Sequence, residues 1–369
     1  MEEEARMDLP HELMIQILLR LPVKSLIRFK CVSKSWFSLI SDTNFANSHF
    51  QITQTPRILF ISTSTCETRS IDFESSLNDD DSVSASLNLD FLLPESYLNL
   101  EIKGSCRGFI FLHCYPNKYL WNPSTGFHKQ IPFSPFGSSL YAEYFYGFGY
   151  DQSTDDYLLV SMLIDPVTNI SSQLEFFSLR GNSWKEIEIE GSHFRYSNPI
   201  EDEQPKPGLL FNEAIHWLAY RHDSRLLRDV IVAFDLTERK LFDMDLPDEF
   251  DHQLDYCGLW VFGEFLSLWA KDCYIDTIEI WVMKEYKMPS SWTKTHVLSF
   301  DSMPSDYFSP LCCTKRGDII ETDGDTGLVK SDDKGQLLEH RSFRNDSHGS
   351  HVAIYTESLL SLPCDGEQA

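Results

Sequence analysis

Three segments of this 369-residue chain hold residues whose types and spacing could support chemistry. The run Asp323–Gly327 (DGDTG) has the alternating acids of a calcium loop, but glycine stands where the fifth-position ligand is needed, so a tight turn is favoured. Gly147-Phe148-Gly149 lacks the third glycine of a dinucleotide-binding fingerprint. His216 lies beside Trp217 in an apolar run, which favours a hydrogen-bonded core histidine over a catalytic base. None of these segments predicts a reaction.

Other catalytic and metal-binding patterns are also missing from the sequence. It contains no G-x-S-x-G, H-E-x-x-H or phosphate-loop pattern. The nine cysteines have no C-x-x-C spacing, so neither a zinc site nor a disulfide framework is indicated. We therefore predict a protein that is not an enzyme and needs no cofactor or metal.

The charge is unevenly distributed along the chain. Residues 1–50 are neutral, with six basic and six acidic side chains, so the whole net charge of −25 lies in residues 51–369. Such a charge excludes nucleic acid as an expected partner. It either keeps a large domain in solution or faces a basic partner. The start of the chain is acidic and no apolar run approaches the length of a membrane span, so we expect a cytoplasmic or nuclear protein away from membranes.

Residues 1–50 have the pattern of three short amphipathic helices. Pro10 can begin the first, Pro22 separates it from the second, and Ser33 can cap a third. Their apolar residues recur at three- and four-residue spacing: Leu13, Ile17, Leu18 and Leu21, then Leu26, Phe29 and Val32, then Trp36, Leu39 and Ile40. A module this small encloses little core, so part of this surface must face a partner, unless it packs against the rest of the chain.

Residues 51–369 have the pattern of an all-β domain. Short β-rich hairpins recur with a period of roughly 50 residues, the length of a kelch-type propeller blade. Blades are expected near 105–132, 144–189, 208–247, 257–299 and 309–343, and 57–94 supplies part of a sixth. The run Val352–Tyr355, followed by Leu359–Leu362, is expected to complete the first blade and close the ring. The predicted fold is thus a three-helix module followed by a kelch-like β-propeller with six blades.

Both parts resemble known families. Leu9–Leu13 (LPHEL), Ile17–Leu26 (ILLRLPVKSL), Cys31–Trp36 (CVSKSW) and Asn44-Phe45 resemble an F-box. Tyr146–Asp151 (YGFGYD), Asp155–Tyr157 (DDY), Asn212–Trp217 (NEAIHW), Glu279–Tyr286 (EIWVMKEY) and Ser291–Lys294 (SWTK) resemble the F-box-associated domain of plant F-box/kelch-repeat proteins, which include the S-locus F-box proteins. The two resemblances together span nearly the whole chain.

The resemblance implies the substrate-recognition subunit of an SCF-type cullin–RING ubiquitin ligase. In that assembly the F-box binds a Skp-family linker, and through it the cullin and RING subunits, while the propeller holds the protein to be ubiquitinated. The positions that match the linker-binding pattern are Leu9, Pro10, Ile17, Leu18, Leu21, Pro22, Leu26, Val32, Trp36 and Leu39. Trp36 and Leu18 are the expected anchors, although some of these residues must instead form the core of the module.

The target is expected at the long connections between strands, because binding functions concentrate on loops of a rigid scaffold. These are the ranges 133–143, 190–207, 221–229, 248–256 and 300–308. Their aromatic and acidic side chains, which suit a basic target, are Tyr141, Tyr196, Glu201, Asp202, Glu203, Asp251 and Tyr256. Two alternatives stay open: an F-box scaffold that delivers no substrate to a ligase, and an enzymatic propeller with its site in the central channel.

Overall fold

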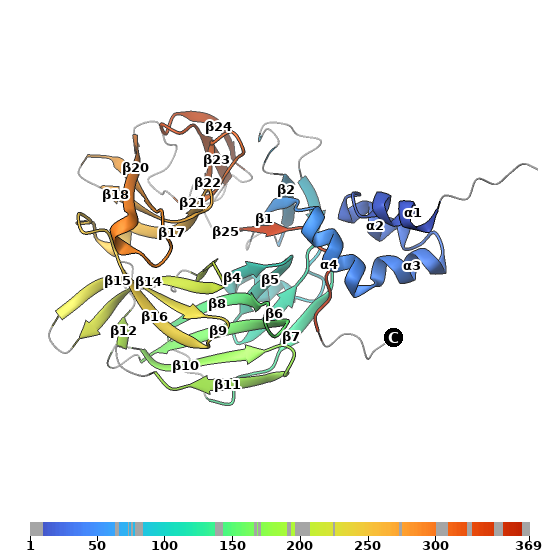
Figure 1. Cartoon of the computed structure of the whole chain (residues 1–369), viewed down its shortest axis with the longest axis horizontal. Coiled ribbons are helices and arrows are strands. Elements are labelled where there is room, and N and C mark those ends of the chain that lie inside the picture. The colour runs from blue at the N-terminus through green and yellow to red at the C-terminus, as the bar shows by residue number, and fades with distance from the viewer. Residues whose placement is uncertain are drawn as a thin grey trace, which may run out of the picture.

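A computed structural model shows four N-terminal helices followed by a six-bladed β-propeller (Figure 1). The structure describes residues 10–62, 66–72, 74, 77, 84–136, 143–165, 168, 171–189, 193–195, 207–223, 226–272, 275–299, 309–322, 327–342 and 350–363. The predicted fold class and the six blades are confirmed. Within these ranges no helix is both long enough and apolar enough to cross a bilayer.

The helical module contains one helix more than the sequence pattern predicted. Its helices are α1 (His11–Leu18), α2 (Val23–Phe29), α3 (Lys34–Ser41) and α4 (Thr43–Ile52). Ser33 caps α3 as expected, because its hydroxyl accepts a hydrogen bond from the Trp36 amide. Asp42 caps α4 in the same way, accepting from the Phe45 amide at 3.0 Å. This second cap starts the fourth helix, which continues past the expected boundary at residue 50.

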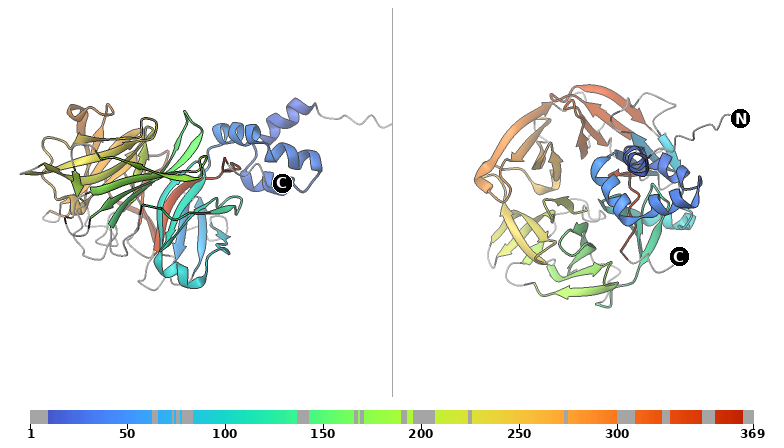
Figure 2. Two further views of the ribbon diagram at one scale, coloured as in Figure 1. Left: turned by 90° about the horizontal axis from the view of Figure 1, so that it is seen from below. Right: turned by 45° about the vertical axis from the view of Figure 1, so that its right-hand side comes forward.

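Each blade is an antiparallel sheet of four principal strands around the ring axis (Figure 2). Blade 1 contains β25 (Ser350–Thr356), β1 (Pro56–Ser62), β2 (Thr68–Asp72) and β3 (Ser84–Leu87). Blade 2 contains β4 (Leu100–Cys106), β5 (Phe109–Cys114), β6 (Asn117–Trp121) and β7 (His128–Ile131). Blade 3 contains β8 (Glu143–Asp151), β9 (Asp156–Ile164), β10 (Ser171–Ser178) and β11 (Ser183–Ile187).

Blade 4 contains β12 (His193–Arg195) and β13 (Leu209–Phe211), which both pair with β14 (Ala214–Asp223), followed by β15 (Leu226–Asp235) and β16 (Lys240–Asp245). Blade 5 contains β17 (Cys257–Phe262), β18 (Phe265–Asp272), β19 (Thr277–Met283) and β20 (Trp292–Ser299). Blade 6 contains β21 (Ser309–Cys313), β22 (Ile319–Thr322), β23 (Gly327–Ser331) and β24 (Leu337–Ser342). Short 3-10 helices cover Pro94–Asn99, Leu254–Tyr256 and Pro289–Ser291.

The ring closes through its two ends, as predicted. Strand β25 pairs with β1 along its whole length, from Pro56 opposite Thr356 to Ser62 opposite Ser350. The Tyr355 hydroxyl also lies 2.7 Å from Ser70 Oγ on β2. The second C-terminal run, Leu359–Leu362, forms no strand of the blade and instead packs beneath the helices.

One hydrophobic core joins the helical module to the propeller. Its members include Leu26, Ile40 and Phe45 from the helices, Phe109 from β5 and Leu360 from the C-terminal run. Part of the apolar surface of the module is therefore covered by the chain itself. The sequence left open whether the apolar surface of the module packs against the rest of the chain or against a partner. On this side it packs against the propeller, whereas other apolar side chains of the helices stay exposed.

The propeller has two faces that differ in their connections. Within a blade, the turns from the first to the second strand and from the third to the fourth lie on one side, which we call the helix face because α4 packs against its β4–β5 turn. The remaining connections form the loop face on the opposite side (Figure 2). One expected long loop, 221–229, is absent, because β14 and β15 stay paired up to Asp223 and Leu226.

Candidate protein-docking surfaces

The free side of the helical module exposes large apolar side chains. Leu13 and Ile17, one turn apart on α1, are 53% and 52% exposed. Val32 and Phe37, before and within α3, are 63% and 57% exposed. Large side chains of this kind are costly to leave in water, so a partner that covers them would gain binding free energy. These four residues define the apolar docking surface.

The structure sorts the ten residues that matched the linker-binding pattern. Leu18 and Leu26 are 2% and 0% exposed and belong to the shared core, so they are not available to a partner. Leu21, Trp36 and Leu39 are half-buried and pack against that core, whereas Pro10, Ile17, Pro22 and Val32 are exposed. Leu9 lies outside the described residues.

Sequence reasoning missed Leu13 and Phe37 as candidate docking residues. Leu13 precedes Ile17 by one helical turn, which puts both on one side of α1, so this spacing could have identified it. No comparable spacing identified Phe37, because the sequence alone does not show which of the adjacent aromatic residues Trp36 and Phe37 faces outward. In the structure Trp36 turns inward and contacts the Phe29 ring edge-on, with 5.3 Å between centroids.

Polar contacts hold the helical module together and also join it to the propeller. His49, which is fully buried on α4, donates from Nε2 to the Leu21 carbonyl at 2.8 Å. The Arg107 guanidinium, from the β4–β5 turn, donates to Asn47 Oδ1 at 2.7 Å and lies 5.2 Å from the centre of the Phe50 ring. The Arg107 contacts, together with the shared core, fix the direction in which the apolar docking surface points relative to the propeller.

The loop face exposes a second set of apolar side chains. They are Leu93, Tyr115, Phe133, Phe136, Tyr256 and Ile275. Only Tyr256 was expected, and it is exposed together with Asp251 in the connection from β16 to β17. The other expected residues of this face, Tyr141, Tyr196, Glu201, Asp202 and Glu203, lie outside the described residues.

The two faces differ in charge. Outside the strands, the described connections of the loop face contain no lysine or arginine, and their exposed acids are Glu67, Asp90, Glu188, Asp248, Glu249, Asp251 and Asp276. The turns of the helix face carry both signs, and their basic residues are Arg107, Arg180, Arg239, Lys284, Lys287, Lys315, Arg316 and Lys334. The described connections of the loop face are therefore the more acidic of the two sets.

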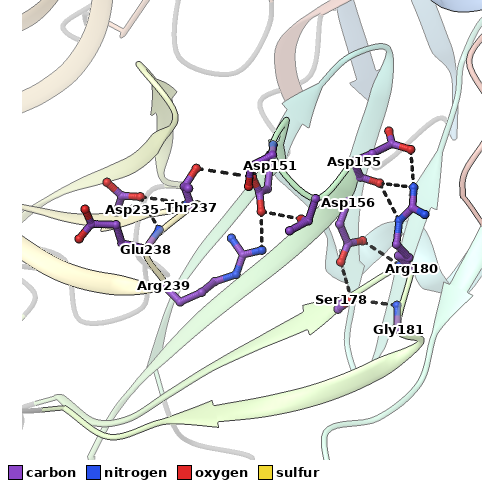
Figure 3. A network of polar contacts seen from close by, with 12 residues as sticks. Asp151, Asp155, Asp156, Ser178, Arg180, Gly181, Asp235, Thr237, Glu238 and Arg239 are labelled. Carbon is purple, nitrogen blue, oxygen red and sulfur yellow. Dashed lines mark hydrogen bonds and ion pairs between the residues drawn. The ribbon is translucent and has the colours of Figure 1, made fainter.

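A polar network on the helix face ties neighbouring blades together (Figure 3). Asp151 is buried at the end of β8 and accepts hydrogen bonds from Thr154 and Ser153, and from Arg239 of the next blade at 2.7 Å. Burial alone would raise the pKa of Asp151, but these donors outweigh it and hold the pKa at about 2. The network thus gives the YGFGYD segment a structural role.

Contacts between neighbouring blades explain two further features of the sequence. A Cβ on Gly147 would lie 2.4 Å from Ile215 Cγ2, so only glycine lets blades 3 and 4 approach this closely. His216 is buried, donates from Nδ1 to the Leu209 carbonyl and accepts from the Tyr286 hydroxyl at 2.8 Å. Burial lowers the pKa of His216 to about 4, so it is the neutral core histidine that the sequence predicted.

One cluster of potential catalytic groups lies on β4 and β5 and is internally paired. Glu101 Oε2 lies 3.1 Å from the buried Lys103 ammonium and 3.4 Å from His113 Nδ1. Burial alone would raise the pKa of Glu101, but these two neighbours hold it at about 2. Among the described residues, no group of three or more histidine, cysteine, aspartate or glutamate side chains could hold a metal ion. Residues 323–326 of the calcium-like run lie outside those residues.

Comparisons with known proteins match both parts of the chain. Residues 7–47 match the F-box domain, and residues 57–360 match the F-box associated beta propeller domain. The F-box/kelch-repeat protein At3g23880 of Arabidopsis thaliana is 30% identical over 82% of this chain and 82% of its own length. The F-box protein CPR1 of the same plant is 29% identical over 97% of this chain and 90% of its own length. Among solved structures, apo AztD from Citrobacter koseri covers 80% of this chain and 86% of its own, with 11% identity and a TM-score of 0.41.

Proposed function

Because the chain belongs to the plant F-box proteins that carry an F-box associated β-propeller domain, we propose that it is the substrate-recognition subunit of an SCF-type cullin–RING ubiquitin ligase. Membership of this family gives it a substrate-recognition adaptor role in general. The assembly, the docking residues and the target-binding face are our proposal. In it the chain contributes no catalytic group and acts in the cytoplasm or the nucleus.

The observation that carries the proposal is the apolar docking surface of Leu13, Ile17, Val32 and Phe37. The opposite side of the helical module is already buried against the propeller. A Skp-family linker would therefore bind the free side, where exposed aliphatic and aromatic side chains can serve as anchors. Pro10, Pro22 and the half-buried Trp36 would border this contact.

The target would bind the loop face. This face points away from the helical module, so the linker and the target can be bound at the same time (Figure 2). Its exposed aromatics, Tyr115, Phe133, Phe136 and Tyr256, supply apolar contact area, and its acids supply a field that attracts a basic surface. Because the contact at α4 holds the helical module and the propeller rigidly together, a target bound there would have a fixed position relative to the ligase.

The linker contact can be tested with charge substitutions on α1 and α3. Ile17→Asp and Phe37→Asp in the full chain should each weaken binding to a purified Skp-family linker at least thirtyfold, about 2 kcal/mol or more, in titration calorimetry. Ile52→Asp is the matched control, because Ile52 on α4 is 56% exposed and lies outside the proposed contact. Full affinity in both test variants would refute the linker assignment.

A further inference from the structure

A groove runs between blades 3 and 4 at the rim of the propeller. It encloses about 600 Å³, a volume in the usual range of ligand sites. Its floor includes the buried side chains of Leu174 and Phe194 and the half-buried side chain of Leu241. The groove is therefore an apolar slot whose walls belong to two different sheets.

The walls of the groove end in strands that have an open edge. Strand β11 is the last strand of blade 3 and β16 is the last strand of blade 4, and neither pairs with a further strand in the part of the chain that the structure describes. Residues of both strands line the groove. Open edges of this kind accept an extended peptide through main-chain hydrogen bonds. A compact small molecule has no series of amide groups whose spacing matches that of the strand.

The charges of the groove favour a cationic ligand. Glu188 on the blade 3 side and Glu238 on the blade 4 side are both exposed, and neither makes an ion pair within the described residues. Arg239, which follows Glu238 in the chain, is held by Asp151 (Figure 3). Its guanidinium lies 5.3 Å from the centre of the Phe176 ring. Lys240 is the one other cation among the described lining residues. The third carboxylate of the lining, Asp243, is paired with Arg221, so Glu188 and Glu238 are the acids available to a ligand.

We propose that this groove binds an extended peptide segment of the target protein that carries a lysine or arginine next to an apolar side chain. The apolar side chain would occupy the floor over Leu174 and Phe194, and the cation would lie at one end of the groove, beside Glu188 at the loop-face end or beside Glu238 at the helix-face end. This inference rests on the proposed function and deepens it. Glu188 begins the loop-face connection that leaves β11, so the groove continues the target-binding face onto the rim.

The experiment first selects peptides that bind the protein and then tests whether substitutions in the groove weaken their binding. Random twelve-residue peptides displayed on phage are selected against the full wild-type chain, and the strongest binder is titrated as a labelled synthetic peptide. Selected sequences should place lysine or arginine within two positions of a large apolar residue. The double variant Glu188→Lys/Glu238→Lys should weaken binding at least tenfold, and Leu241→Trp, which fills the slot, should do the same.

The control variant Glu264→Lys/Asp333→Lys makes the same change in net charge at two exposed sites away from the groove and should stay within twofold of wild type. Failure to select any peptide, selection of peptides without cations, or equal affinity in the groove and control variants would overturn the proposal. So would a dimer of the chain that the groove variants abolish, because the occupant would then be a second copy. Linker affinity, measured in parallel on all variants, reports separately on the proposed function.

Discussion

Arg107 donates a hydrogen bond to Asn47 across 2.7 Å and thereby joins a propeller turn to the last helix of the F-box. The same guanidinium lies over two rings, 5.2 Å from the centre of Phe50 and 4.1 Å from that of Tyr150. One propeller side chain thus contacts both sides of the junction. The relative position of the two domains depends on this residue as well as on the shared core.

Replacing Arg107 with alanine should loosen the junction. The variant loses a charge-assisted hydrogen bond and two cation–ring contacts, so we expect a loss of about 1 to 3 kcal/mol in the stability of the docked helix. Hydrogen exchange in residues 43–55 should become faster by a corresponding factor. Arg316→Ala, on an exposed turn of the same face, is the control. Unchanged exchange in α4 would show that the core alone holds the domains.

Leu18 should behave as a core residue and Phe37 as an interface residue. Leu18→Ala should lower the free energy of unfolding by about 2 to 5 kcal/mol, because Leu18 is 2% exposed and leaves a cavity. Phe37→Ala should leave stability nearly unchanged and weaken linker binding by about 2 kcal/mol. Chemical denaturation and calorimetric titration of both variants test this division, and the opposite pattern would contradict it.

A chain that ends at Gly349 should aggregate. Without β25, blade 1 loses its inner strand, and β1 loses the partner that it pairs with from Pro56 to Ser62. The open edge is then free to pair with other molecules. A chain that ends at Pro363 keeps β25 and should remain monomeric. Light scattering and thermal melting distinguish the two, and a monomeric, cooperatively melting short form would show that closure is dispensable.

Glu321 should make the protein less stable as the pH rises. Its side chain is 2% exposed on β22, and neither carboxyl oxygen has a hydrogen-bond partner among the described residues. Burial raises its pKa from 4.5 to about 8. Between pH 4.5 and pH 8 the folded state therefore keeps a proton that the unfolded state has released. Since the folded form holds the extra proton, stability falls from pH 4.5 to pH 8.

The variant Glu321→Gln removes this titration. Between pH 5 and pH 7 the stability of the wild type should fall by roughly 2 kcal/mol relative to the variant. Urea denaturation of both proteins across this range provides the measurement, with Glu264→Gln on an exposed turn as the control. Parallel curves for wild type and Glu321→Gln would mean that Glu321 is ionised in the folded protein.

Neutralising the acids of the loop face should weaken target binding. Asp251 is the described test position, and Glu201, Asp202 and Glu203, which the sequence pattern predicts for a target-binding loop, are neutralised with it. A target co-purified under proteasome inhibition should bind wild type less tightly as salt rises, and should lose most of this salt dependence in the variant. Neutralising Glu264, Glu285 and Asp333 on the helix face is the control. Equal binding by both variants, at low and high salt, would exclude an acidic target site.

Local pattern allowed much of the fold to be predicted from sequence. The hairpins around Asp235–Lys240 and Ser178–Ser183 consist of β-rich runs on either side of a turn, and counting such units led to the correct number of blades and to closure by Val352–Tyr355. Two errors were also local. Asp42 was not recognised as the cap of α4, and the polar run 221–229 was interpreted as a loop although its residues pair across a hairpin.

The sequence by itself determined the family, the order of the two domains and the concentration of negative charge in residues 51–369, because these depend on residue types and on their spacing along the chain. Only the tertiary structure decided which apolar residues are available to partners. Leu18 and Ile17 are adjacent and equally apolar, yet Leu18 enters a core that includes Leu360, more than 300 residues away, while Ile17 faces outward. Helical spacing identifies an apolar residue, but long-range packing decides what covers it.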